Sequence, residues 1–237
     1  MAQINYLCGL MKKIFLFLVL LLPALACLAQ EPYYITKAGT VLHYERYKAS
    51  SGKLIQTTRI EVDSIVNKPD GQRVFYSLLL EKGNGRDLYG GQMDQYVDIN
   101  RQGDVMTDMG KFAEQAMKNL FPRARIRAEG SLAVMPSRMQ PGDTIPGAHA
   151  DIYAGSLKFT IDILGRSVLR YETITTPAGT FDCIVARERK IEEGPLRHHD
   201  NWSDNWYVRG IGYVRHDIYD KDMKLEATEV LTRIETK

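Results

Sequence analysis

Histidine is the side chain in this sequence best suited to metal chemistry, and one run concentrates it. Arg197-His198-His199-Asp200 places two imidazoles and a carboxylate within four residues. Adjacent side chains diverge in an extended segment, and no further ligand follows at the fixed offset that a structural zinc site requires. We therefore interpret this run as part of a polar loop and expect no metal site.

His216 lies between Val214 and Ile218, at positions that alternate along the chain. Side chains two residues apart point to the same face of a strand, so the spacing predicts an inward-facing histidine. It is either a satisfied core residue or the polar group that orients an apolar ligand. Nearby, Trp206 and Tyr207 offer the large aromatic area that both cores and ligand pockets use. These five residues form the candidate ligand-binding set.

Catalytic motifs are missing from the sequence. It contains no Gly-x-Ser-x-Gly elbow, no Walker loop and no dinucleotide fingerprint, and Gly83-x-Gly85 opens no helical pattern. We therefore expect a protein that is not an enzyme, has no catalytic residues and uses no cofactor.

The first 29 residues have the features of a secretory signal peptide. Lys12 and Lys13 precede nine consecutive apolar residues at 14–22. That length suits the apolar region of a signal peptide and is shorter than the roughly 20 residues that a membrane-spanning helix needs. A retained N-terminal membrane anchor is the alternative interpretation.

Two cleavage points fit the small residues that end this region. Cleavage after Ala29 leaves Gln30 at the start of the mature chain, whereas cleavage after Ala26 leaves Cys27. The second would suit a lipoprotein, but Ala24 stands where the lipobox usually has Leu. We therefore expect cleavage near Gln30 and a periplasmic or secreted protein, with a lipoprotein anchored through Cys27 as the alternative.

The charge of the mature chain excludes some partners. Removing the leader takes away two lysines and no acidic residue, so the 31 basic residues fall to 29 against 29 acidic ones. The charges are well mixed, which argues against a nucleic-acid-binding face and against a polybasic membrane segment. Cys183 alone of the three cysteines remains, flanked at alternating positions by Phe181 and Val185. It is predicted to be a buried structural thiol.

Most of the mature chain alternates with period two and is interrupted by turn residues, which predicts consecutive antiparallel strands. Residues 157–164 and 168–176 are expected to be two strands, and residues 190–204 a long polar loop. A turn at residues 176–180 is expected to place Gly179 at a positive φ. Nine or ten strands in one sheet curl toward a barrel or split into a sandwich.

One segment, residues 111–120, changes to a helical period. Its apolar residues share one face of a helix and are Phe112, Ala113, Ala116, Met117 and Leu120. Thr107 or Asp108 is the expected N-cap, and Phe121-Pro122 is the expected stop. The helix either packs on the core or forms a mobile cover over a cavity.

Two stretches resemble a known family. One is the Pro-Ala-Gly-Thr-Phe hairpin at residues 177–181, and the other is Trp-Tyr-Val-Arg-Gly-Ile-Gly at residues 206–212. Together with the Pro-Gly-Asp turn at 141–143, they resemble the exported TapB-like family of uncharacterised Gram-negative proteins. The resemblance implies a strongly curved antiparallel sheet rolled into an incomplete barrel, similar to YmcC-like and lipoprotein-carrier-like folds. It transfers no catalytic residues.

The sequence thus predicts a signal peptide over residues 1–29 and a single, mostly antiparallel all-β domain over residues 30–237. The leading hypothesis is a non-enzymatic periplasmic or envelope protein whose curved sheet binds an apolar or lipid-like ligand. The alternative is an envelope structural or protein-interaction module without a small-molecule ligand. A cavity of roughly 300 Å³ or more favours the first, and a filled core with a large exposed apolar patch favours the second.

Overall fold

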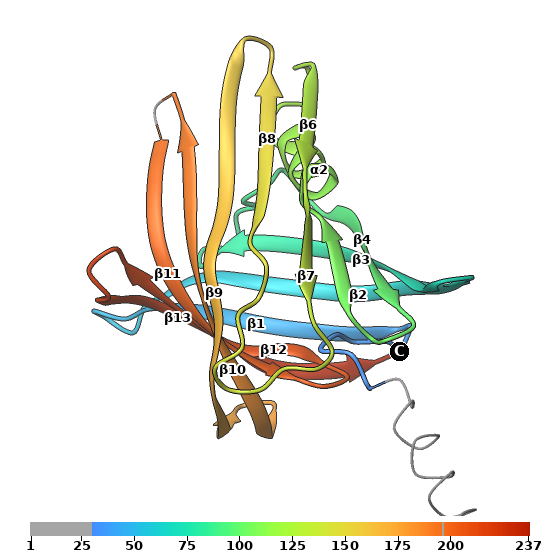
Figure 1. Cartoon of the computed structure of the whole chain (residues 1–237). Coiled ribbons are helices and arrows are strands. Elements are labelled where there is room, and N and C mark those ends of the chain that lie inside the picture. Colours follow the sequence, from blue (N-terminus) through green and yellow to red (C-terminus); the bar gives the residue numbers. More distant parts are fainter. Residues whose placement is uncertain (1–29, 196) are drawn as a thin grey trace, which may run out of the picture. The chain divides into compact units, whose positions relative to one another are not determined.

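Alternating apolar and polar residues build one antiparallel sheet that contains all the described strands (Figure 1). The computed structural model describes residues 30–195 and 197–237, so the expected signal peptide lies outside the described residues. Glu31–Lys237 form a single unit with dense internal contacts.

The sheet has thirteen strands among the described residues. They are β1 (Thr40–Lys48), β2 (Leu54–Lys68), β3 (Gly71–Lys82), β4 (Met93–Asn100), β5 (Val105–Asp108), β6 (Ile126–Gly130), β7 (Leu132–Met135), β8 (Ala148–Ala154), β9 (Leu157–Thr176), β10 (Gly179–Gly194), β11 (Arg197–Val208), β12 (Gly212–Asp220) and β13 (Leu225–Thr236). Their order in the sheet is β6-β8-β9-β10-β11-β12-β13-β1-β2-β3-β4-β5-β7, so β6 and β7 are its two edges.

The period-two pattern decides which face of each strand turns inward. In β4, Met93, Gln95, Val97 and Ile99 are buried while the residues between them are more exposed. Successive side chains of a strand point to opposite faces, so one face of β4 lines the interior. The same alternation in neighbouring strands gathers apolar side chains from far-apart segments into one core.

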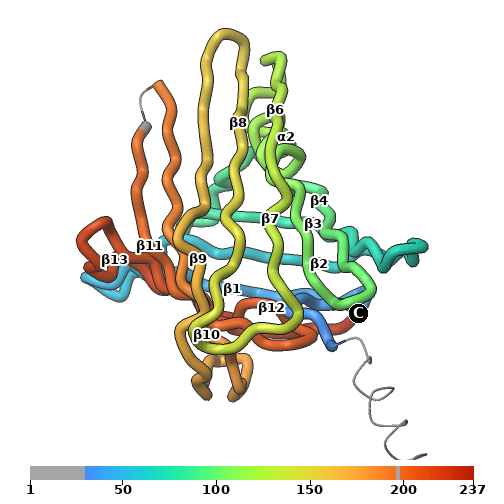
Figure 2. Tube along the Cα trace, viewed as in Figure 1, coloured from blue at the N-terminus to red at the C-terminus, as the bar shows by residue number. Residues whose placement is uncertain are grey.

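The sheet is strongly curved and rolls into a nearly closed barrel, as expected (Figures 1 and 2). Register shifts interrupt several strand pairs, including β1 with β13 and β2 with β3. Such bulges bend a strand and increase its twist, which favours rolling. The number of strands is larger than the nine or ten expected, because β6 and β7 have only five and four residues and two of the three buried residues of β8 are alanines.

The predicted loop at residues 190–204 is wrong, because β10 continues to Gly194 and β11 already begins at Arg197. Bidentate ion pairs join these strands. Arg187 binds Asp204 through contacts of 2.7 and 2.8 Å, and Arg189 binds Asp200 through contacts of 2.8 and 2.6 Å. Cross-strand pairs of opposite charge stabilise the pairing of two strands. Because these residues are polar, the segment lacks the alternation of apolar and polar residues by which a strand is recognised in a sequence.

The two strands expected at 157–164 and 168–176 form the single strand β9. Gly165 lies between them at φ +56°, beside a register shift with β10. Glycine tolerates this left-handed conformation, so the strand bends there without ending. The hairpin between β9 and β10 matches the expected turn, with Gly179 at φ +142°.

The predicted helix is confirmed as α2 (Met109–Leu120). Asp108 is the N-cap, and its carboxylate accepts a hydrogen bond of 3.0 Å from the backbone amide of Lys111. The helix packs against β6 and β8, and its closest approach is at Gly110, whose backbone nitrogen would lie 2.7 Å from a Cβ on Gly130.

Within the described part of the chain, no helix has both the length and the apolar character to cross a bilayer.

Candidate functional site

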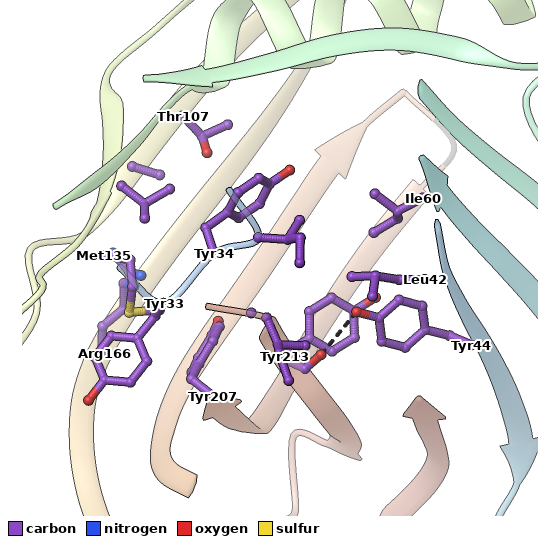
Figure 3. Close-up of a pocket in the computed structure, with 15 residues that line it drawn as sticks. Tyr33, Tyr34, Leu42, Tyr44, Ile60, Thr107, Met135, Arg166, Tyr207 and Tyr213 are labelled. Carbon is purple, nitrogen blue, oxygen red and sulfur yellow. Dashed lines mark hydrogen bonds between the residues drawn. The ribbon is translucent and has the colours of Figure 1, made fainter. Parts of the chain in front are cut away.

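A cavity of about 180 Å³ lies inside the barrel (Figure 3). Its walls come from the inward faces of β1, β2, β5, β7, β9, β11 and β12 and from the segment before β1. Tyrosines dominate the lining: Tyr33, Tyr34, Tyr44, Tyr207 and Tyr213. The ring of Tyr44 stacks on Tyr213 with centroids 4.6 Å apart, and its hydroxyl donates to the Tyr213 carbonyl at 3.0 Å. The cavity is therefore walled by both aromatic and aliphatic side chains.

A second and larger cavity of about 490 Å³, which we call the groove, lies beside α2. One wall is the apolar face of α2, including Phe112, Ala116 and Met117. Ile161 and Ile163 of β9 extend the same apolar surface. The residues that the helical period identified thus line the groove, whereas Ala113 and Met109 also pack against β8 in a small separate core.

The wall formed by β10 is charged. Lys190 lies opposite Ile163 in the β9–β10 ladder, and Glu192 lies opposite Ile161. The Lys190 ammonium contacts the Glu192 carboxylate at 2.8 Å, and Glu188 and Glu193 also line the groove. A boundary between charged and apolar side chains therefore runs along the groove, which is the surface that an amphiphilic molecule requires.

Four residues line both cavities and mark where they meet: Thr107, Ala133, Arg166 and Tyr207. We call this junction the throat. Thr107 and Ala133 lie directly opposite each other in the β5–β7 pair. Arg166 comes from β9 and Tyr207 from β11, and both are labelled in Figure 3. The groove and the barrel cavity thus adjoin at these four side chains.

Arg166 is the most constrained of the throat residues. Its guanidinium Nη1 donates to the backbone carbonyls of Val134 and Pro146, at 2.8 Å each. Its Nε donates to the carboxylate of Glu188 at 3.3 Å. Because Val134 belongs to the edge strand β7, this side chain also joins β7 to β9, the third strand from the opposite edge of the sheet. A buried cation with these partners is fixed in position.

A polar cluster inside the barrel surrounds Glu229, which is only 1% exposed. Its carboxylate accepts hydrogen bonds from Thr58 (3.0 Å), Arg46 (3.2 Å) and Tyr213 (3.3 Å). His216 Nδ1 lies 4.0 Å from the same carboxylate. Burial, followed by the charges of Arg46 and Lys190, lowers the pKa of His216 to about 3. The imidazole is therefore neutral, and the cluster stabilises the barrel interior.

The five predicted site residues are divided by the sheet. Tyr207 lines both cavities, and His216 and Ile218 share its face because they pair with Asn205 and Ser203, two and four residues before it. Trp206 points to the opposite face.

There the Trp206 indole nitrogen donates to Glu172 at 3.0 Å, and the guanidinium of Arg215 lies 4.7 Å from the ring centroid. Val214 is fully buried, next to the register shift between Trp206 and Tyr207. Neither Trp206 nor Val214 lines the barrel cavity or the groove.

Sequence reasoning missed the throat. Thr107 was noted only as a helix cap, and Ala133 lies in a strand too short to be recognised. Arg166 follows the Gly165 bulge and looks like an ordinary charged residue in the sequence. No local pattern could have identified these three, because long-range strand pairing brings them together.

The other side chains that the sequence singled out as possible reactive or metal-binding groups are Cys183, His198 and His199. Cys183 is buried as predicted, and burial raises the pKa of its thiol to about 12, so it stays protonated. Among residues 30–195 and 197–237, no group of three or more His, Cys, Asp or Glu side chains is arranged to hold a metal ion. His198 and His199 lie near the start of β11 rather than in a loop.

The fold defines a class of nearly closed antiparallel β-barrels with one short helix. A crystal structure of a predicted exported protein with a YmcC-like fold from Bacteroides fragilis has this architecture, with a TM-score of 0.68 and 24% identity over 87% of this chain and 100% of that one. So does a predicted lipoprotein from Parabacteroides distasonis, with a TM-score of 0.68 and 22% identity over 87% of this chain and 99% of that one.

The chain belongs to the DUF3108-like family, whose model matches residues 37–231. The two similar solved structures confirm the YmcC-like fold that the resemblance implied. Membership of the TapB-like family is not confirmed. None of the curated proteins compared with the chain is significantly similar to it.

Proposed function

We propose that the protein is an exported, non-enzymatic binder of an amphiphile with an apolar chain. The observation that carries the proposal is the groove, with a volume of about 490 Å³, an apolar wall, a charged wall and a position beside the barrel cavity. Ligand pockets have volumes of roughly 300 Å³ and above, with mostly apolar linings and a few polar groups. The groove meets this description.

The two walls suggest how such a ligand would lie. Transferring a methylene group from water to an apolar surface contributes about 0.8 kcal/mol, so a chain would follow Ile161, Ile163 and the helix face. A polar end group loses free energy when it is buried without partners. It would therefore stay beside Lys190 and Glu192, near solvent.

The polar cluster in the barrel supports a role without catalysis. A general acid or base needs a pKa near the working pH and a position at the cavity surface. The pKa of His216 is far below neutral pH, and Glu229 is saturated with hydrogen bonds. Neither side chain lines the groove.

Export is supported by the lysines and apolar run before residue 30 and by the two structural neighbours, one a predicted exported protein and one a predicted lipoprotein. Periplasmic or envelope localisation is the setting in which an amphiphile carrier would meet membrane lipids.

The second candidate function is an envelope interaction module that binds a protein partner. Exposed apolar side chains favour it, above all Tyr171 at 62% and Leu132 at 53% exposure. Large exposed apolar groups mark interaction surfaces when they form contiguous patches.

The binding proposal is tested with N-phenyl-1-naphthylamine, whose fluorescence rises in apolar surroundings. We expect the wild-type protein to bind the probe saturably and a fatty acid to displace it. Ala116→Phe fills the groove from the helix and should weaken probe binding at least tenfold. Lys118→Phe adds the same ring at an exposed position of the same helix and should leave binding unchanged.

Failure of the wild-type protein to bind the probe, or equal binding by the two phenylalanine variants, would count against a ligand in the groove. Either result would favour the second candidate function, an envelope module that binds a protein partner.

A further inference from the structure

We propose that the throat admits the end of one unbranched alkyl chain into the barrel cavity, so that Ala133 determines the longest chain the protein can bind. This inference rests on the proposed function, because it assumes that the groove holds an amphiphile. It adds the class of ligand, a single-chain amphiphile, and a residue that selects among chain lengths.

The first step is that the two cavities adjoin. Thr107, Ala133, Arg166 and Tyr207 line both, so a chain that passes from the groove into the barrel cavity would do so between these side chains. Ala133 contributes only a methyl group at this point. Any larger side chain at position 133 would therefore narrow the passage.

The second step is that the throat is held by rigid contacts. Thr107 and Ala133 belong to paired strands. Arg166 is held by two carbonyls and by Glu188. A passage with fixed walls selects its ligand by shape, because widening it would break these buried hydrogen bonds.

The third step concerns which end of the ligand passes. Beyond the throat the lining is aromatic and aliphatic, with Leu42, Ile60 and Met135 among the tyrosines. The hydroxyl of Tyr44 already donates to the Tyr213 carbonyl. A charged head group would lose its hydration there without gaining matching partners, whereas the charged wall of β10 lies on the groove side. The apolar end must therefore enter the barrel.

The fourth step is size. A volume of about 180 Å³ holds roughly six groups as large as a water molecule, which occupies about 30 Å³ and is similar in size to a methylene group. One chain end fits this space, and a second chain or a fused ring system does not. A single-chain amphiphile is thus the class of ligand that suits both cavities.

The test compares straight-chain fatty acids of 8, 10, 12 and 14 carbons as competitors of N-phenyl-1-naphthylamine, all below their micelle concentrations. Each added methylene should raise affinity about fourfold, which corresponds to about 0.8 kcal/mol. In Ala133→Phe the throat is blocked, so the 14-carbon acid should lose more affinity than the 8-carbon acid. The affinity ratio between the 14-carbon and 8-carbon acids should fall at least tenfold.

Two further variants make the result specific. Ala133→Ser changes the size of the side chain little and should keep the wild-type ratio. Met135→Ala, which enlarges only the barrel cavity, should raise the affinity for the 14-carbon acid relative to the 12-carbon acid. This variant also provides a measurement if Ala133→Phe does not fold.

The outcomes separate the two proposals. Binding of all four acids with a ratio that neither Ala133→Phe nor Met135→Ala changes would overturn the throat while leaving the groove as a binding site. Absence of any probe or fatty-acid binding by the wild-type protein would overturn the proposed function, and the throat with it.

Discussion

The imidazole of His216 is neutral in the folded protein because burial and two nearby cations lower its pKa to about 3. In the unfolded chain the pKa of a histidine is about 6.5. Below pH 6.5 the unfolded state therefore binds a proton that the folded state does not. The stability associated with this group is fully present above pH 6.5 and is lost as the pH falls toward 3, by up to about 1.4 kcal/mol per pH unit.

We therefore expect the free energy of unfolding of the wild-type protein to fall more between pH 7 and pH 4.5 than that of His216→Gln. Urea denaturation at both pH values measures the difference. His149→Gln is the matched control, because a hydrogen bond to Asp162 raises the pKa of His149, which reverses the sign of its contribution. Equal losses in the wild type and His216→Gln would show that His216 is not held neutral.

The sequence could predict which residues share one face of a strand, but it could not predict which of the two faces turns toward the barrel interior. Alternation placed His216 and Ile218 on one face correctly, but Val214 lies at a register shift, and none of the three lines the barrel cavity or the groove. Alternation could not choose between Trp206 and Tyr207, because adjacent residues point in opposite directions and both neighbourhoods are rich in aromatic and aliphatic side chains. The choice depends on how the whole sheet rolls, and Tyr207 is the residue on the concave side.

At the scale of elements, α2 was predictable because its period, cap and stop all agree. The carboxylate of Asp108 binds the amide of Lys111 at the start of the helix. Asp108→Ala should lower the free energy of unfolding by about 1 kcal/mol, since one backbone amide loses its partner. Asp108→Ser can still cap and should recover most of the loss in a thermal denaturation experiment. A melting temperature unchanged in Asp108→Ala would mean that the cap contributes nothing.

The hairpin in which residues 187–194 of β10 pair with residues 197–204 of β11, which we call the arm, was not predictable from hydrophobicity. Its pairing relies on the ion pairs of Arg187 with Asp204 and of Arg189 with Asp200, so its sequence reads as polar and irregular. The arm nevertheless carries the charged wall of the groove. The segment predicted to be a loop thus supplies Lys190, Glu192 and Glu193 to the groove.

At the scale of the whole molecule, curvature follows from many consecutive antiparallel strands joined by short turns, and the sequence predicts this pattern although it gives too few strands. Closure cannot be predicted in this way, because it depends on pairings between β5 and β7 and between β6 and β8 that involve strands of four to seven residues. The cavities exist only after closure. This is why the fold class was predicted and the throat was not.

The localisation of the whole molecule is open to a direct measurement. The lysines and apolar run in the leader predict that the mature chain begins near Gln30. N-terminal sequencing of the protein recovered from the periplasmic fraction should find that start. A chain that begins at a lipid-modified Cys27 in the membrane fraction would establish the lipoprotein alternative instead.

The two edges of the sheet, β6 and β7, are separated in the chain by Ser131 alone. The Ser131 amide donates to the His149 carbonyl at 2.9 Å, its hydroxyl accepts from the His149 amide at 2.9 Å, and its carbonyl accepts from Met109 at 3.2 Å. A force that pulls the sheet edges apart at this point therefore loads the covalent backbone and not a row of hydrogen bonds. The covalent link at Ser131 therefore prevents the two edge strands from separating at this end of the sheet.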